Sequence, residues 1–407
     1  MALANIKYSA LQTALRTTTE TLAHELARPT ANEPDWSDFE WRIARAVAAM
    51  HGVSALLSGT LRWVGPPGWR EFLREQKAQT AARHPRIENL LKIIDQRMRA
   101  DDIPLVALKG AELHARGLYC PGERPMADVD LLVRSADVPR TSRALESLGF
   151  YETLSNWKHK AFIPNNPVPP SGLGERADNY LKIELHERIC EILPLDTAEV
   201  TEQMFPRQPH PGLNGYPSIA ALMSHLLLHA AGAMAYRALR LVHLNDIARL
   251  SAQMSCEDWN EVLREPARVG GPWWALPPLQ LAARYYSSSI PAGVLAHLAD
   301  DCPRLLRVFT QRRTLSDVSL SRLRIDAFPG IEWSQSISEL ARYIMSRLHP
   351  GRETLELRAH ASRSQPAEQQ SEWQRLSQTR RILRWIVSRQ ARSETLYNVR
   401  TALAQTQ

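Results

Sequence analysis

Apolar residues in the first hundred positions recur three and four apart, the spacing that places them on one face of an α-helix. The pattern is clearest in FEWRIARAVAAMHGVSALLSGTLRWV, residues 39–64, and in RIENLLKIIDQRMRADD, residues 86–102. From Ile103 onward it changes to short apolar runs with helical stretches between them. These patterns predict an N-terminal helical region over residues 1–100 and a region of mixed strands and helices after it.

The short apolar runs predict the strands of one small sheet. They are IPLVAL (103–108), DVDLLV (128–133), FYETL (150–154), KAFIP (160–164) and LKIELHERI (181–189). Helical stretches follow the first run and the second. We therefore expect an α+β fold in which residues 101–215 form a small mixed sheet with helices packed against it, flanked by N-terminal and C-terminal helical regions.

Helical periodicity returns after the predicted sheet. Residues 216–360 are expected to form a helical domain, and residues 361–407 a linker and a basic C-terminal helix, with HASRSQPAEQQSE as the most linker-like segment. That helix carries an apolar stripe formed by Trp373, Leu376, Leu383 and Ile386 or Val387. We expect the stripe to face the core and the arginines to face solvent. Contact with an RNA backbone or an anionic membrane is the less common alternative.

The stretch NNPVPPSGLGERADN, residues 165–179, is rich in proline, glycine and asparagine. This composition predicts a long loop between two strands. Such a loop is either a lid over a bound substrate or a plain connection, and the sequence leaves both open.

Composition and charge exclude several classes of protein. With 407 residues, 44% of them hydrophobic and 23% charged, the chain is expected to be globular with two or three domains. Four cysteines without a C-x-x-C pair indicate neither a zinc cluster nor a disulfide scaffold and favour a reducing, cytoplasmic location.

We recognise no secretory signal in the sequence. The uncharged stretch 218–236 is expected to be a buried helix rather than a membrane span, because it contains His225 and His229. The formal charge of +7 suits an anionic ligand, although an arginine-rich surface gives the same value.

Two aspartates, Asp128 and Asp130, interrupt the apolar run DVDLLV. Alternate residues of a strand share a face, so the two carboxylates project together while the residues between and after them face the core. Paired carboxylates repel each other unless a cation lies between them, and Mg²⁺, which takes oxygen ligands and substrate phosphates, is the usual one. A lone D-x-D is common, but here a preceding strand ends in Lys109 and Gly110 and opens into a helix, a combination more typical of a phosphate site.

The stretch LKGAELHARGLYCPGERPMADVDLLV, residues 108–133, resembles the signature of the uncharacterised nucleotidyltransferase family of the DNA polymerase β-like superfamily. Members read Lys-Gly, then an arginine shortly before Asp-x-Asp, then Leu-Leu-Val. The resemblance continues into SLGFY, IELHERI and LLLHAAGAMAYRALRLVHLNDIARL, and covers residues 50–250 or thereabouts. It implies a small sheet carrying three carboxylates and two Mg²⁺ ions, which transfers a nucleoside monophosphate from an NTP to an acceptor with release of pyrophosphate.

The resemblance assigns Asp128 and Asp130 to the paired metal-ligand positions and Glu184, in IELH, to the third. These three are the predicted catalytic and metal-binding residues. Many relatives carry aspartate where Glu184 stands. Because three carboxylates converge, one of them is expected to have a raised pKa when no metal is bound. Lys109 and Gly110 stand where the wider superfamily has Gly-Ser.

The residues predicted to contact the nucleotide are Lys109, Gly110, Arg124 and His186. Lys109 either neutralises the β- and γ-phosphates or caps the end of its strand. Arg124 either grips a phosphate with two guanidinium nitrogens or pairs with a carboxylate. His186 shares a face with Glu184, where it orients that carboxylate, contacts the acceptor, or is a hydrogen-bonded core histidine.

We interpret the sequence as that of a cytoplasmic, Mg²⁺-dependent nucleotidyltransferase that uses an NTP and an acceptor, with a small molecule or peptide favoured. His229 and Asp246 match positions of the family's helical region and either line the far side of the cleft or tie helices together. Two alternatives stay open. One is an RNA-directed transferase, either tRNA-modifying or toxin-like, and only the basic C-terminal tail favours it. The other is a non-catalytic nucleotide-binding protein, and the three carboxylates argue against it. The sequence names neither the acceptor, nor the preferred base, nor the oligomeric state.

Overall fold

One six-stranded mixed sheet organises the middle of the chain. The computed structural model, which describes residues 7–167, 172–264, 271–351, 376–388 and 390–404, has the strand order β3-β4-β5-β2-β1-β8. β2 runs parallel to β5 and β1 parallel to β8, and the other neighbours are antiparallel. The strands are β1 (Pro104–Ala107), β2 (Asp128–Leu132), β3 (Phe150–Ser155), β4 (His159–Pro164), β5 (Lys182–His186) and β8 (Gly212–Asn214). The predicted α+β fold, a small mixed sheet with flanking helices, is confirmed.

Short elements connect the strands. α5 (Gly110–Ala115) joins β1 to β2, and α6 (Val138–Ser147) joins β2 to β3. β6 (Cys190–Ile192) and β7 (Thr197–Glu199) form a separate two-stranded antiparallel sheet beyond β5. Single 3₁₀ turns occur at Ser135–Asp137, Thr201–Met204, Trp273–Ala275 and Ile331–Trp333.

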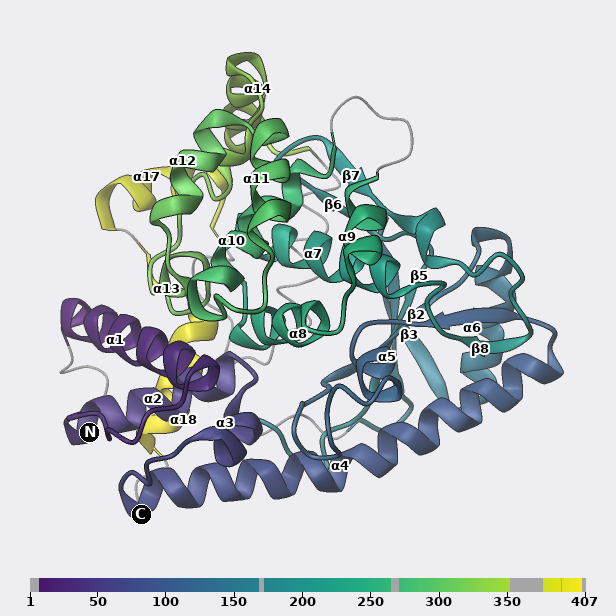
Figure 1. Cartoon of the computed structure of the whole chain (residues 1–407), viewed down its shortest axis with the longest axis horizontal. Helices are drawn as coiled ribbons and strands as arrows, with labels where there is room; N and C mark the ends of the chain where they lie inside the picture. Colours follow the sequence, from purple (N-terminus) through teal and green to yellow (C-terminus); the bar gives the residue numbers. More distant parts are fainter. Residues whose placement is uncertain (1–6, 168–171, 265–270, 352–375, 389, 405–407) are drawn as a thin grey trace.

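Helix α4 (Pro67–Ala100), 34 residues long, runs along one face of the sheet (Figure 1). A proline occupies its first turn, where the missing N–H breaks no helical hydrogen bond. Its buried apolar side chains share one core cluster with those of the strands, among them Ile87, Leu90, Ile94, Met98, Leu105, Val129, Leu131, Ile183 and Leu185. Since side chains alternate along a strand, the polar residues of β2 and β5 lie on the opposite face of the sheet.

Helices from the two ends of the described chain pack together. The N-terminal helices are α1 (Tyr8–Ala27), α2 (Asp38–Met50) and α3 (Ser54–Thr60). α18 (Ser393–Ala404), drawn in yellow in Figure 1, lies against α2, drawn in purple. The Thr395 hydroxyl of α18 also donates to the Leu320 carbonyl at 2.6 Å. The end of the described chain is thus part of the N-terminal helical packing.

The helical region after the sheet is built around α7 (Ile219–Ala235), of which almost every residue is buried. The predicted buried helix is therefore confirmed, and no helix in the described part of the chain has the length and apolarity needed to span a membrane. The helices that follow are α8 (Leu241–Ser251), α9 (Cys256–Leu263), α10 (Leu276–Tyr285), α11 (Ala292–Asp301), α12 (Arg304–Arg312), α13 (Leu315–Val318) and α14 (Ile337–Leu348).

Helix α17 (Gln378–Ser388) does not bury the apolar stripe predicted for it. Leu383 is 58% exposed and Val387 is 85% exposed, so the expectation of a core-facing stripe is wrong at these two positions. The described part of α17 packs along α14, and neither side chain belongs to the main core cluster. The predicted linker, residues 360–372, and Trp373 lie outside the described residues.

The C-terminal part of the predicted loop, residues 172–179, is anchored on α4. The Gln76 side chain donates to the Leu173 carbonyl at 3.3 Å and accepts from the Glu175 backbone N–H at 2.8 Å. Leu173 is itself buried. These contacts favour a plain connection for this part, while residues 168–171 lie outside the described residues.

Candidate active site

The parallel pairing of β2 and β5 places acidic residues side by side. Asp128 lies opposite Lys182, and Asp130 lies opposite Glu184. Directly opposed residues of neighbouring strands project to the same face, so these side chains meet on the side of the sheet away from α4. As predicted, Val129 projects to the other face, where it is 1% exposed in the core. The structure therefore brings the three predicted carboxylates to one face.

A buried arginine of α4 holds the beginnings of these two strands together. Arg83, which is 2% exposed, donates to the carbonyls of Met126 and Ala127 just before β2, at 3.0 and 3.1 Å. The same guanidinium donates to the carbonyls of Asn179 and Tyr180 just before β5, at 2.7 and 3.2 Å. Five N–H donors in a rigid fork suit this task, which a lysine could not perform. Arg83 could not be predicted from the sequence, because a helical pattern carries no information about contacts with two distant loops.

Each of the three carboxylates is paired with a cation or a histidine of the chain. The Lys109 Nζ lies 3.0 Å from Asp130 Oδ1, and the His186 Nε2 lies 2.9 Å from the same oxygen. The Lys182 Nζ lies 2.5 Å from Glu184 Oε1 and 3.5 Å from Asp128 Oδ2. Lys182 was not predicted, although its alternation with Glu184 along the strand would have placed it on this face. The chain thus supplies its own positive charges to a strongly acidic site.

Because of these pairings, the three carboxyl groups have different pKa values. Burial raises the pKa of Asp128, and the charges of Asp130 and Glu184 raise it further. Burial also acts to raise the pKa of Asp130, but the Lys109 ammonium and the His186 ring outweigh it and hold that pKa well below its usual value. The pKa of Glu184 is lowered as well, because hydrogen bonding by His186 and the charge of Lys182 outweigh burial and the repulsion of Asp130. The expectation that one carboxyl has a raised pKa is confirmed, and that carboxyl is Asp128.

Lys109 has a backbone conformation that few residues adopt. Its φ is 43° and its ψ is −110°, a combination that costs free energy and occurs mostly where surrounding contacts enforce it. One such contact is the Lys109 backbone N–H, which donates to the Tyr216 hydroxyl at 3.2 Å; that hydroxyl lies 2.7 Å from the His225 Nδ1. The next residue, Gly110, has no room for a side chain, since a Cβ there would lie 2.6 Å from the Met126 sulfur. The Lys-Gly pair is therefore fixed by its packing, with the ammonium directed at Asp130.

Arg124 and Asp246 form a buried bidentate ion pair. The Arg124 Nε and Nη2 each lie 2.8 Å from an Asp246 oxygen, and the Tyr119 hydroxyl donates to Asp246 at 2.7 Å. The Asp246 side chain is 1% exposed and the Arg124 side chain 10%. Of the alternatives for Arg124, the structure contains the arginine–carboxylate pair, while nucleotide binding by Arg124 stays a prediction. Asp246 ties α8 to the loop before β2.

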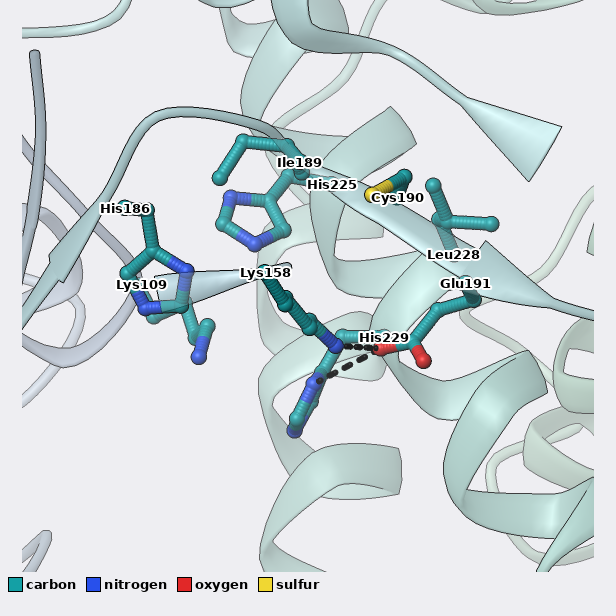
Figure 2. Close-up of a pocket in the computed structure, with 9 residues that line it drawn as sticks. All are labelled: Lys109, Lys158, His186, Ile189, Cys190, Glu191, His225, Leu228 and His229. Carbon is teal, nitrogen blue, oxygen red and sulfur yellow. Dashed lines mark hydrogen bonds and ion pairs between the residues drawn. The ribbon is translucent and has the colours of Figure 1, made fainter. Parts of the chain in front are cut away.

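A small pocket, with room for about one water molecule, lies beyond Lys109 and His186. Figure 2 shows Lys158 and His229 both directed at Glu191, with Nζ and Nδ1 at 2.5 and 3.8 Å from Glu191 Oε1. Burial acts to raise the pKa of Glu191, but His229 and Lys158 outweigh it and lower that pKa. The pocket is completed by Ile189, Cys190, His225 and Leu228. His229, one of the two helical residues singled out in the sequence, therefore lines a pocket that borders the carboxylate site.

Comparison with known proteins defines the class of this enzyme. Residues 37–287 match the family described as uncharacterised nucleotidyltransferase, and the match includes the whole sheet. The protein is therefore a nucleotidyltransferase. The chain belongs to the uncharacterised nucleotidyltransferase family, as the motif around Asp128 and Asp130 indicated. No curated protein and no solved structure matches the chain.

Proposed function

We propose that this enzyme transfers a nucleoside monophosphate from an NTP to a hydroxyl group of a small-molecule or peptide acceptor, with Mg²⁺ as its metal, in the cytoplasm. The observation that supports this most directly is the register of β2 and β5, which sets Asp130 beside Glu184 and within reach of Lys109. Three carboxylates and a lysine on one face of a small sheet, in a chain of this family, are the groups that phosphoryl chemistry requires.

The donor set fits a divalent metal. Asp128, Asp130 and Glu184 offer only oxygen atoms, the ligands that Mg²⁺ prefers. Lys182 lies against two of these carboxylates and Lys109 against the third, so the chain's own ammonium groups balance the negative charge that a metal ion would otherwise neutralise. Two Mg²⁺ ions held by the three carboxylates would polarise the α-phosphate and stabilise the charge that develops on it.

The residues of the chain have separate tasks in the proposed reaction. The acceptor oxygen forms a bond to the α-phosphorus while the bond from that phosphorus to the bridging oxygen of pyrophosphate breaks. Glu184 stays ionised because its pKa is lowered, and as a metal ligand it would help to activate the acceptor hydroxyl, whose proton passes to solvent. The Lys109 ammonium and the Gly110 N–H steady the phosphates that leave as pyrophosphate. His186, beside both Asp130 and Glu184, orients these carboxylates.

The position of Lys182 leads to a prediction about metal affinity. Its ammonium occupies the space between Asp128 and Glu184, so an entering metal ion must displace it. Lys182→Met is expected to raise the affinity for Mg²⁺ by about tenfold, since one favourable charge interaction near a protein surface amounts to about 1–4 kcal/mol. Titration calorimetry without nucleotide measures this. Lys160→Met is the control, because Lys160 pairs with Glu152 and not with the site. Equal Mg²⁺ affinity in the two variants would show that Lys182 does not compete with metal.

The proposed reaction is tested by incubating the enzyme with each NTP, radiolabelled at the α-phosphate, in a cell extract with Mg²⁺. Label is expected in a small-molecule or peptide fraction; label in RNA would instead support the RNA-directed alternative. Glu184→Gln keeps the shape of the side chain and removes its charge. It is expected to bind NTP nearly as well as the wild type and to transfer label at least ~100-fold more slowly. Normal transfer by this variant would exclude Glu184 as the third carboxylate.

A further inference from the structure

Two histidines of neighbouring strands stand beside Glu184. β4 and β5 are antiparallel, with His159 directly opposite His186 and Ala161 opposite Glu184. Opposed residues and alternate residues share a face, so His159, His186 and Glu184 project together. The His159 Nε2 lies 3.9 Å from Glu184 Oε1, and the His186 Nε2 lies 3.6 Å from Glu184 Oε2. One candidate ligand atom from each residue lies within 4.8 Å of the other two.

The donor atoms of this group differ from those of the aspartates. Imidazole nitrogens suit Mn²⁺, Co²⁺, Zn²⁺ and similar ions of the first transition row, whereas Mg²⁺ takes oxygen ligands. Around a tetrahedral ion with bonds of about 2.1 Å, ligand atoms stand roughly 3.4 Å apart. The observed separations of 3.6 and 3.9 Å are close to this value, so small side-chain rotations suffice to enclose an ion.

The two imidazole rings are also incompletely satisfied. The Nδ1 atoms of His159 and His186 are buried, and neither has a hydrogen-bond partner among the described residues. The ring centroids are 5.1 Å apart. An ion bound through the Nε2 atoms would not pair these Nδ1 atoms, which are the other nitrogen of each ring. The inference therefore rests on the geometry of the Nε2 atoms and the Glu184 oxygens.

We propose that His159, Glu184 and His186 bind one divalent ion of the first transition row in preference to Mg²⁺. The inference rests on the proposed function in taking Glu184 as a metal ligand, and it replaces Mg²⁺ at this carboxylate by an ion of the first transition row. The His186 Nε2 also lies 2.9 Å from Asp130 Oδ1, so an ion bound at this nitrogen would replace that hydrogen bond. The metal at Glu184 would differ in kind from an ion held by Asp128 and Asp130 alone.

The test is metal binding by the full chain without nucleotide. Co²⁺ is the probe because its visible absorption reports nitrogen coordination, and Mg²⁺ and Mn²⁺ are compared by calorimetry. We expect one equivalent of Co²⁺ to bind at least about tenfold more tightly than Mg²⁺. His159→Ala should weaken Co²⁺ binding by about 10–100-fold and leave Mg²⁺ binding within about twofold. If thermal unfolding shows that His159→Ala is destabilised, His159→Gln, which keeps a polar side chain, is used in its place.

His210→Ala is the matched control, since His210 is an exposed histidine outside this group. Co²⁺ that binds no more tightly than Mg²⁺, or equal losses in the His159 and His210 variants, would overturn the inference. The radiolabel assay decides the proposed function separately. Tight Co²⁺ binding without any transfer would support the metal site and exclude the proposed function. Mg²⁺-dependent transfer without preferential Co²⁺ binding would support the proposed function and exclude the metal site.

Discussion

Asp128→Asn and Asp130→Asn are each expected to abolish nucleotidyl transfer, but to have different effects on stability. Loss of a metal ligand removes several kcal/mol of transition-state stabilisation, which corresponds to about a thousandfold or more in rate. Stability differs because the two carboxylates have different partners. Asp130 is buried against Lys109 and His186. Asp128 is a third exposed, and its pKa is raised by its partial burial and by the charges of Asp130 and Glu184.

The sign follows from the direction of each pKa shift. A carboxyl whose pKa is lowered by folding stabilises the protein at all pH values above its unfolded pKa, so Asp130→Asn should lower the free energy of unfolding at pH 7. The loss is expected to be about 3 kcal/mol, because Lys109 is left without its nearest counter-ion. A carboxyl whose pKa is raised opposes folding when it is ionised, so Asp128→Asn should leave the stability at pH 7 unchanged or slightly higher.

Denaturant unfolding at pH 7 and the radiolabel assay, applied to both variants, measure these effects. Equal destabilisation by the two substitutions would show that the unequal partners of the aspartates do not control stability. Transfer at the normal rate by either variant would remove that aspartate from the metal site.

Asp246→Ala is expected to destabilise the protein by about 3–5 kcal/mol. The substitution leaves the Arg124 guanidinium buried without its bidentate partner, and the Tyr119 hydroxyl without its acceptor. Removing one member of a buried ion pair is costly because the remaining charge stays desolvated. The pair connects α8 to the loop before β2, so the aspartates should also become less well positioned.

Denaturant unfolding of Asp246→Ala and of Glu202→Ala tests this expectation. Glu202 also pairs with an arginine, Arg134, but the two side chains are 79% and 45% exposed. An exposed pair contributes about 0–1 kcal/mol, so the control should change little. A loss below about 1 kcal/mol in Asp246→Ala would show that the pair is not a structural support, and would return Arg124 to the residues available for a phosphate.

The strands and the acidic residues could be predicted because their signals are local. Apolar alternation around Asp128 and Asp130 reports a strand with one polar face, and a period of two residues fixes which side chains share it. The same reasoning placed Glu184 and His186 on one face, as the register of β5 confirms. For α17 it failed, since a helical stripe shows which side is apolar but not whether the fold provides a surface for it to pack against.

The partners of the site residues were decided only by the tertiary structure. Arg83 spans two loops far apart in sequence, Lys182 comes to lie between two carboxylates through strand pairing, and His159 joins the site because β4 lies beside β5. Arg124 was predicted with two roles, and only the position of α8 gave it Asp246 as a partner. The sequence by itself determined which side chains can ionise and which face of a strand each occupies, because these depend on covalent structure and the backbone period. The pairing of these charges depends on the order and register of strands that are dozens of residues apart in the sequence. This order and register exist only in the folded chain.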